Sequence, residues 1–116
     1  MRKWTDLELE TWIVKAGDDV VEKEAARGRA ALSLLEKLIY CVWVADYGMR
    51  NAGDLVIASD VYSQFQEEAA SLALELGMPR THAAFALPTA DLERRYFDLL
   101  SGVVDEIDAN RGAGGK

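Results

Sequence analysis

The chain has 116 residues and carries a formal net charge of −7 at pH 7. Half of its residues are hydrophobic and 28% are charged, which excludes a disordered chain and fits one folded domain. The acidic balance argues against direct binding of nucleic acid, which requires a basic surface, and favours basic protein partners.

A first helix is predicted from about Asp6 to Ala26. Thr5 and Glu8 have the spacing of a capping box. The segment Gly17-Asp18-Asp19 either breaks this helix or only weakens it, and Gly28 separates it from the next segment. Apolar residues recur along it at helical spacing, namely Leu9, Trp12, Ile13, Ala16 and Val20.

The next segment, AALSLLEKLIYCVWVADYG, is predicted to be a helix that is apolar around most of its circumference. Such a helix belongs in the middle of a bundle. The β-branched stretch LIYCVWV is also compatible with a strand, but the leucines before it and Glu36-Lys37 favour a helix.

A turn is predicted after this helix, within Arg50-Asn51-Ala52-Gly53. Gly53 permits a positive φ, and the side chain of Asn51 can hydrogen-bond the backbone. Asp54 can cap the segment that follows. We expect Leu55 to Ala58 to form either a short helical turn or an extended link on the core.

The clearest helix is predicted to have Ser59 as its N-cap and Asp60 near its positive end. Gly77 is placed to end it, followed by the apolar Met78 and by Pro79 as a stop. Its inward face consists of Val61, Phe65, Ala69, Leu72 and Leu76.

Two further helices complete the prediction. A short one covers Thr81 to Ala86, and Pro88 ends it. Thr89 is expected to cap the last helix, whose inward residues are Leu92, Tyr96, Leu99, Leu100, Val103 and Ile107. We therefore expect an all-α, single-domain bundle of about five helices with a central hydrophobic helix over residues 1–109, and a flexible C-terminal tail over residues 110–116.

Cys41 is the single cysteine, so an intrachain disulfide is excluded, and its apolar neighbours indicate a buried thiol in a reducing compartment. The N-terminal MRKWTDLELE has no apolar segment of a secretory signal. The longest apolar run, Leu38 to Ala45, has eight residues, and a membrane-spanning helix needs about 20. We expect a cytoplasmic protein without membrane contact.

No catalytic constellation is evident in the sequence. His82 is the single histidine and lacks the neighbouring Cys, Asp or Glu residues of a metal site. Cys41 lies in an apolar helix, where a thiol is inert, so its pairing with His82 as a nucleophile is not expected. There is no glycine-rich phosphate loop. We expect a protein that is not an enzyme and that binds neither a metal nor a cofactor.

The acidic residues are the strongest functional indication. Between Asn51 and Pro79 the sequence has five acids and no base. On one continuous helix, Asp60, Glu67 and Glu75 would share a stripe about 80° wide and about 22 Å long. The predicted partner-binding residues are Asp54, Asp60, Glu67, Glu68 and Glu75. An ordinary solvated helix face is the alternative interpretation, because every surface helix has one.

A second acidic group lies on the last helix, with no base between its members: Asp98, Asp105, Glu106 and Asp108. Unpaired acids are unusual on a helix, since Lys or Arg four residues away would stabilise it. Both groups therefore point to a surface that binds a basic partner.

The segment MRNAGDL resembles a motif of a small helical bacterial family of mostly unknown function that includes a DNA-mimic protein. The resemblance covers roughly Leu32 to Ile107: a hydrophobic helix, the Asn51/Gly53 turn, a helix ending at Leu76-Gly77, and the aromatic pair Tyr96-Phe97. Ala52 stands where the family has a glycine. The resemblance implies an acidic protein that binds a nucleic-acid-binding protein by DNA mimicry.

Three other functions are left open by the sequence. An immunity or antitoxin-like protein would also neutralise a basic partner. A ligand-binding or enzymatic bundle would need a pocket between helices, and the residues considered for it are Trp12, Trp43, Tyr47 and His82. A homodimer would bury apolar side chains that a monomer exposes, such as Val56 or Leu74.

Overall fold

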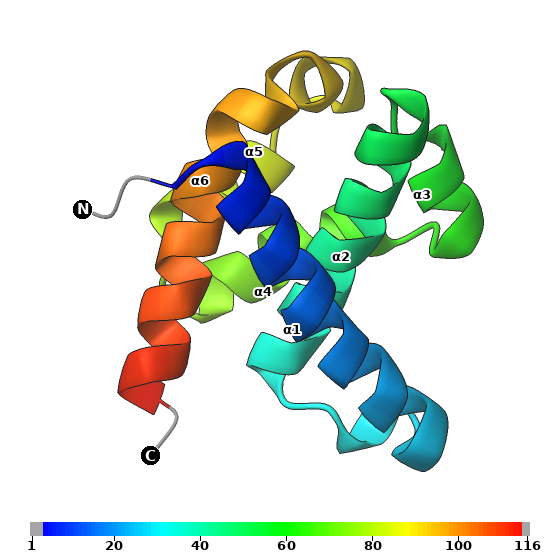
Figure 1. The fold of residues 1–116 in the computed structure, drawn as a ribbon, viewed down its shortest axis with the longest axis vertical. Helices are drawn as coiled ribbons and strands as arrows, with labels where there is room; N and C mark the ends of the chain where they lie inside the picture. The colour runs from blue at the N-terminus through cyan, green and yellow to red at the C-terminus, as the bar shows by residue number, and fades with distance from the viewer. Residues whose placement is uncertain (1–3, 115–116) are drawn as a thin grey trace.

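The computed structural model describes residues 4–114, and in this part of the chain it has six α-helices, one short 3-10 helix and no strand. The strand alternative for LIYCVWV is therefore wrong, and the expected all-α bundle is confirmed (Figure 1). The elements are α1 (Asp6–Arg27), η1 (Arg29–Ala31), α2 (Leu34–Ala52), α3 (Val56–Val61), α4 (Phe65–Glu75), α5 (Pro79–Phe85) and α6 (Thr89–Gly114).

Helix α1 begins with the predicted capping box. The backbone N–H of Glu8 donates to the side chain of Thr5, and the N–H of Thr5 donates to the carboxylate of Glu8. The helix continues without a break through Gly17 and ends at Gly28, whose φ is 85°. Of the two alternatives for Gly17-Asp18-Asp19, a break in the helix is therefore wrong.

Helix α2 is the centre of the bundle and contacts α1, α3, α4 and α6. The side chains of Leu38, Cys41 and Val44 are completely buried. Burial of one such aliphatic side chain contributes about 1.5–3 kcal/mol to folding. A second capping box, between Ser33 and Glu36, fixes the start of α2. Ser33 and Glu36 have the same spacing as Thr5 and Glu8, so the sequence contained this signal.

Helices α1 and α2 run antiparallel, as the ion pairs along their seam show. Lys23 of α1 contacts Glu36 at the start of α2, with Nζ and Oε1 3.0 Å apart. At the other end, Glu10 lies 3.9 Å from Arg50. In Figure 1, α1 crosses in front of α2, with α6 on one side and α3 on the other.

Helix α2 extends further than predicted. Arg50, Asn51 and Ala52 belong to its last turn, so the four-residue turn is wrong for these positions. The Asn51 side chain donates to the carbonyl O of Tyr47 at 2.7 Å, a hydrogen bond within the helix. Gly53 ends the helix in the left-handed region with φ 76°, as its lack of a side chain allows.

The segment after Gly53 forms two helices where one was expected. Ser59 and Asp60 lie inside α3, and a break at residues 62–64 precedes α4, which begins at Phe65. The side chain of Val61 is 48% exposed, so its predicted place on the inward face is wrong. The apolar spacing of the two helices matched that of one helix, and no glycine or proline marked the break.

The end of α4 agrees with the prediction. Gly77 has φ 71°, its N–H donates to the carbonyl O of Leu74, and the N–H of Met78 donates to that of Ala73. These two bonds form a Schellman motif. Pro79 is the first residue of α5, where its missing N–H costs nothing.

Helix α6 begins after Pro88, whose carbonyl O accepts from the N–H groups of Asp91 and Leu92. The Thr89 hydroxyl, expected as a cap, donates instead to Gln66 at 2.9 Å. The predicted inward face is confirmed, with Leu92, Tyr96, Leu100, Val103 and Ile107 buried and Leu99 partly buried. The helix continues to Gly114, so residues 110–114 extend it where a tail was expected, and residues 115–116 lie outside the described part.

The close contact of α1 with Trp43 of α2 depends on Gly17. A Cβ atom added at Gly17 would lie 2.1 Å from Cδ1 of Trp43, whereas one at Gly102 in α6 would meet only the Arg80 side chain at 3.4 Å. We expect Gly17→Ala to lower the free energy of unfolding by about 1–3 kcal/mol through overpacking. Gly102→Ala should leave it unchanged or raise it by up to about 1 kcal/mol, because alanine favours helix. Urea denaturation of both variants measures this, and a Gly17→Ala protein as stable as Gly102→Ala would contradict it.

Candidate partner-binding surface

The five acids predicted to bind a partner separate into two groups. Asp60 on α3 and Glu67 and Glu75 on α4 are exposed, and no ion pair or hydrogen bond joins their carboxylates to another side chain of residues 4–111. Asp54 and Glu68 are half-buried and serve the fold. We call Asp60, Glu67 and Glu75 the free acids.

Asp54 fixes the start of α3. Its Oδ1 accepts the backbone N–H of Val56 at 3.1 Å, but Leu55 holds the N-cap position, so Asp54 acts from the residue before the cap. The neighbouring N–H, that of Leu55, donates to Glu93 of α6 at 2.8 Å. Two carboxylates thus satisfy the first amides of this short helix, and Asp54 is only in part available to a partner.

Glu68 belongs to a cluster of side chains that joins η1 to α3 and α4. It forms an ion pair with Arg29 and accepts a hydrogen bond from the Tyr62 hydroxyl. The Arg29 guanidinium lies 5.2 Å from the ring centre of Tyr40 and 4.8 Å from that of Tyr62. Burial and the bond to Glu68 raise the pKa of Tyr62 to about 12. The segment between Asn51 and Pro79 has no basic residue, and the cation that pairs with Glu68 is therefore Arg29, which is distant in the sequence.

The three free acids do not form the continuous stripe that the sequence predicted. Asp60 lies on a different helix from Glu67 and Glu75, because the chain leaves helical geometry at residues 62–64. Glu67 and Glu75 are eight residues apart, about 12 Å along α4. Leu74, 66% exposed, lies beside Glu75. The surface is therefore sparse in charge compared with duplex DNA, which has about one charge per 1.7 Å.

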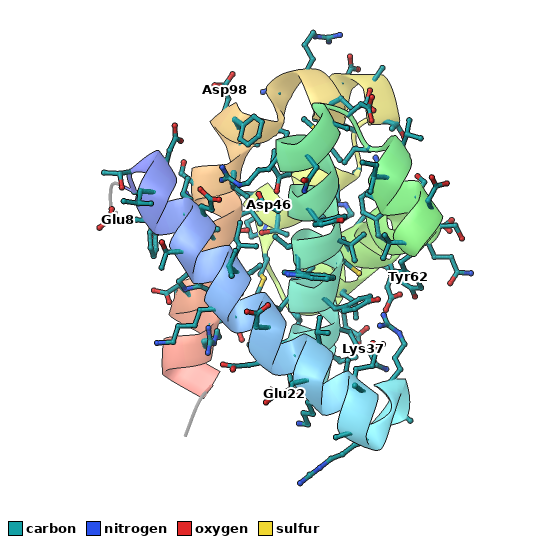
Figure 2. All side chains as sticks on the ribbon, turned by 45° about the vertical axis from the view of Figure 1, so that its right-hand side comes forward. Glu8, Glu22, Lys37, Asp46, Tyr62 and Asp98 are labelled. Carbon is teal, nitrogen blue, oxygen red and sulfur yellow. The ribbon has the colours of Figure 1, made fainter. Side chains whose placement is uncertain are left out.

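Most acids of the second group are paired with other groups of the protein. Arg80 pairs with Asp105 at 2.9 Å and with Glu106 at 3.4 Å. Glu106 also accepts the N–H groups of Arg80 and Thr81 at the start of α5. Asp108 accepts the indole N–H of Trp12 at 3.0 Å. Asp98 alone in this group is exposed without such a contact among the described side chains (Figure 2).

A buried polar cluster that was not predicted from the sequence lies between α2 and α6. Asp46 is 3% exposed, and its carboxylate accepts the Tyr96 hydroxyl and the Arg50 Nε–H, each at 2.8 Å. Burial raises the pKa of Asp46, against the opposing effects of these two donors. The Arg50 guanidinium also lies 5.3 Å from the ring centre of Phe97. Figure 2 places Asp46 between the helices. The i,i+4 spacing of Asp46 and Arg50 was the available signal.

Cys41 and His82 are each held by the surrounding fold. Cys41 is completely buried, and this burial raises the pKa of its thiol to about 12. Nδ1 of His82 lies 2.8 Å from the carbonyl O of Ala70. Among the described residues, no group of three or more His, Cys, Asp or Glu side chains is placed to hold a metal ion.

The pockets do not gather the residues considered for a ligand site. His82 lines a pocket of about 260 Å³ with Leu74 and Met78. A pocket of about 790 Å³ lies between α1, the start of α2 and the end of α6, where Lys23, Leu34 and Arg111 are among its lining residues. Trp12, Trp43 and Tyr47 line neither pocket.

The apolar side chains named for a homodimer are exposed, with Val56 at 62% and Leu74 at 66%. No helix in the described part of the chain combines the length and the apolar character needed to cross a membrane. The chain matches no protein-family model, no curated protein and no solved structure. The resemblance around Arg50 to Gly53 therefore stays a prediction.

The neighbours Glu67 and Glu68 provide a matched test of this division of roles. We expect Glu68→Gln to lower the free energy of unfolding by about 1–2 kcal/mol, because Arg29 and Tyr62 lose a charged acceptor. Glu67→Gln should change it by less than about 0.5 kcal/mol. Equal effects of the two substitutions in urea denaturation would show that Glu68 has no special structural role.

The raised pKa of Asp46 predicts a pH effect of defined sign. Asp46 stays protonated to a higher pH in the native state than in the unfolded state. Its contribution to stability therefore falls as pH rises from the unfolded-state pKa, about 3.9, through the native-state pKa. Asp46→Asn removes this contribution. We expect the stability of the wild type relative to Asp46→Asn to decrease over that window in urea denaturation at a series of pH values. A relative stability that increases with pH would refute the direction of the shift.

Proposed function

We propose that the protein is a non-enzymatic interaction protein that binds a basic protein partner through the free acids Asp60, Glu67 and Glu75. The observation that supports this most is the difference between these acids and the others of the same segment. Glu68 and Asp54 have internal partners, whereas the three free acids have none among the described side chains.

The net charge of the whole chain also favours a basic partner. A net charge of −7 attracts a basic surface over a distance of about a Debye length, near 8 Å at physiological ionic strength. Glu67 and Glu75 share α4 with an exposed leucine, Leu74, so this helix combines charge with exposed apolar area, as a protein-binding surface with an apolar centre and a polar rim does.

A nucleic-acid-binding protein is the partner class that the sequence resemblance implies, because its own binding face is basic. DNA mimicry is the form this would take. The wide spacing of the free acids favours recognition of a few lysine or arginine side chains over imitation of a complete phosphate row.

The test compares two triple variants that change the net charge equally. Asp60→Asn/Glu67→Gln/Glu75→Gln neutralises the free acids, and Asp18→Asn/Glu22→Gln/Asp98→Asn neutralises three exposed acids of α1 and α6. Each protein is immobilised, cell lysate is passed over it at low salt, and the retained basic proteins are eluted with a salt gradient and identified. We expect the first triple variant to lose at least about tenfold in retention of the partner, and the control to retain it.

The folded state of each variant is checked by its thermal unfolding, which should be unchanged because these side chains are exposed. Equal loss in both variants would mean that net charge alone attracts the partner. Unchanged retention in the first variant would refute the assignment of the free acids.

A further inference from the structure

A row of aromatic side chains follows the outer side of α2. The ring centres of Tyr40 and Trp43 are 6.1 Å apart, and those of Trp43 and Tyr47 are also 6.1 Å apart. The planes of Trp43 and Tyr47 differ by only 20°. Tyr62 extends the row beyond Tyr40, with ring centres 5.7 Å apart. We call Tyr62, Tyr40, Trp43 and Tyr47 the aromatic row.

The middle of the row is fixed in place and accessible. Trp43 is half-buried, and its indole lies against the backbone of α1 at Gly17, where a Cβ atom would be 2.1 Å away. Tyr47 is 48% exposed. A rigid tryptophan stacked on the exposed Tyr47 holds that ring in place, so the ring loses little conformational entropy when a planar group stacks on it.

An arginine of the chain itself occupies each end of the row. At one end Arg29 lies over Tyr40 and Tyr62. At the other end Arg50, one helical turn after Tyr47, lies over Phe97. Among the described residues no cation lies over Trp43 or Tyr47.

The charges at the Tyr47 end of the row favour a further cation. Arg50 has two carboxylates beside it, those of Asp46 at 2.8 Å and Glu10 at 3.9 Å, so this end has one negative charge in excess when Asp46 is ionised. At the other end Arg29 also has two carboxylates, those of Glu24 at 3.6 Å and Glu68, but Lys37, three residues before Tyr40 on α2, balances them. The exposed Tyr47 thus lies at the negative end of the row.

We propose that Trp43 and Tyr47 form a stacking site for an arginine side chain of the protein partner. The inference rests on the proposed function, since it names the kind of side chain that the basic partner presents. A guanidinium is planar and weakly hydrated and stacks on aromatic faces, whereas the lysine ammonium is compact and strongly hydrated. A proline-rich segment also packs on aromatic rows, but it does not use the negative charge at the Tyr47 end.

The test uses three synthetic peptides of 12 residues with a fluorescent label. In the first peptide arginine alternates with glycine. In the second, lysine replaces each arginine, and in the third, proline replaces each arginine. Fluorescence anisotropy at low salt gives the dissociation constant of each peptide for the full-length protein. We expect the arginine peptide to bind about two- to fivefold more tightly than the lysine peptide, the range for an exposed cation–π contact. Tyr47→Leu should remove this preference, and Tyr47→Phe, which keeps the ring, should retain it.

Three results would overturn the inference. Equal binding of the arginine and lysine peptides, both weakened by neutralising Asp60, Glu67 and Glu75, would leave the proposed function standing without the stacking site. An arginine preference that persists in Tyr47→Leu would place the site elsewhere. Binding of the proline peptide alone would assign the row to a different class of partner and would also contradict the proposed function.

Discussion

The arrangement of this bundle depends on the burial of α2. A helix with completely buried side chains such as Leu38, Cys41 and Val44 must be covered on several sides, and α1, α3, α4 and α6 all contact it. Tyr40, Trp43 and Tyr47 lie where this cover is incomplete, with Tyr40 and Trp43 half-buried and Tyr47 exposed, and aromatic rings suit such a position because they tolerate both apolar contact and water. The burial of α2 therefore also determines which part of the protein surface carries aromatic side chains.

The distribution of charge follows from the same architecture. The chain has more carboxylates than cations, and some of its arginines pair with more than one acid, as Arg29 pairs with Glu24 and Glu68 and Arg80 pairs with Asp105 and Glu106. The acids near cations are used to fix helices against one another. Asp60, Glu67 and Glu75 have no such pair among the described side chains, and they are the residues proposed to act on another molecule. A count of acids along the sequence cannot make this distinction, because the pairs Arg29–Glu68 and Arg80–Glu106 are far apart in the chain.

Local signals predicted much of the fold. The capping box at Thr5, the Schellman motif at Gly77 and the apolar face of α6 each depend on residues within about one or two helical turns, and all three occur in the structure. The break between α3 and α4 was missed because Tyr62-Ser63-Gln64 carries no strong turn residue, and the contact of Tyr62 with Glu68 and Arg29 is tertiary. Of the candidate surface, the exposure of Glu67 and Glu75 followed from helical spacing, whereas the place of Asp60 on a separate helix, the internal role of Glu68 and the cluster around Asp46 needed the packing of distant helices.

The complete burial of Cys41 has a practical consequence for experiments on this chain. A thiolate is the reactive form, and a thiol with a pKa raised to about 12 is almost entirely protonated at neutral pH. A cysteine introduced at an exposed position, such as Ser71→Cys on the outer side of α4, would therefore be the one nucleophilic sulfur in the folded protein. Spin labels, fluorophores or crosslinkers can be attached beside the free acids without first replacing the native cysteine.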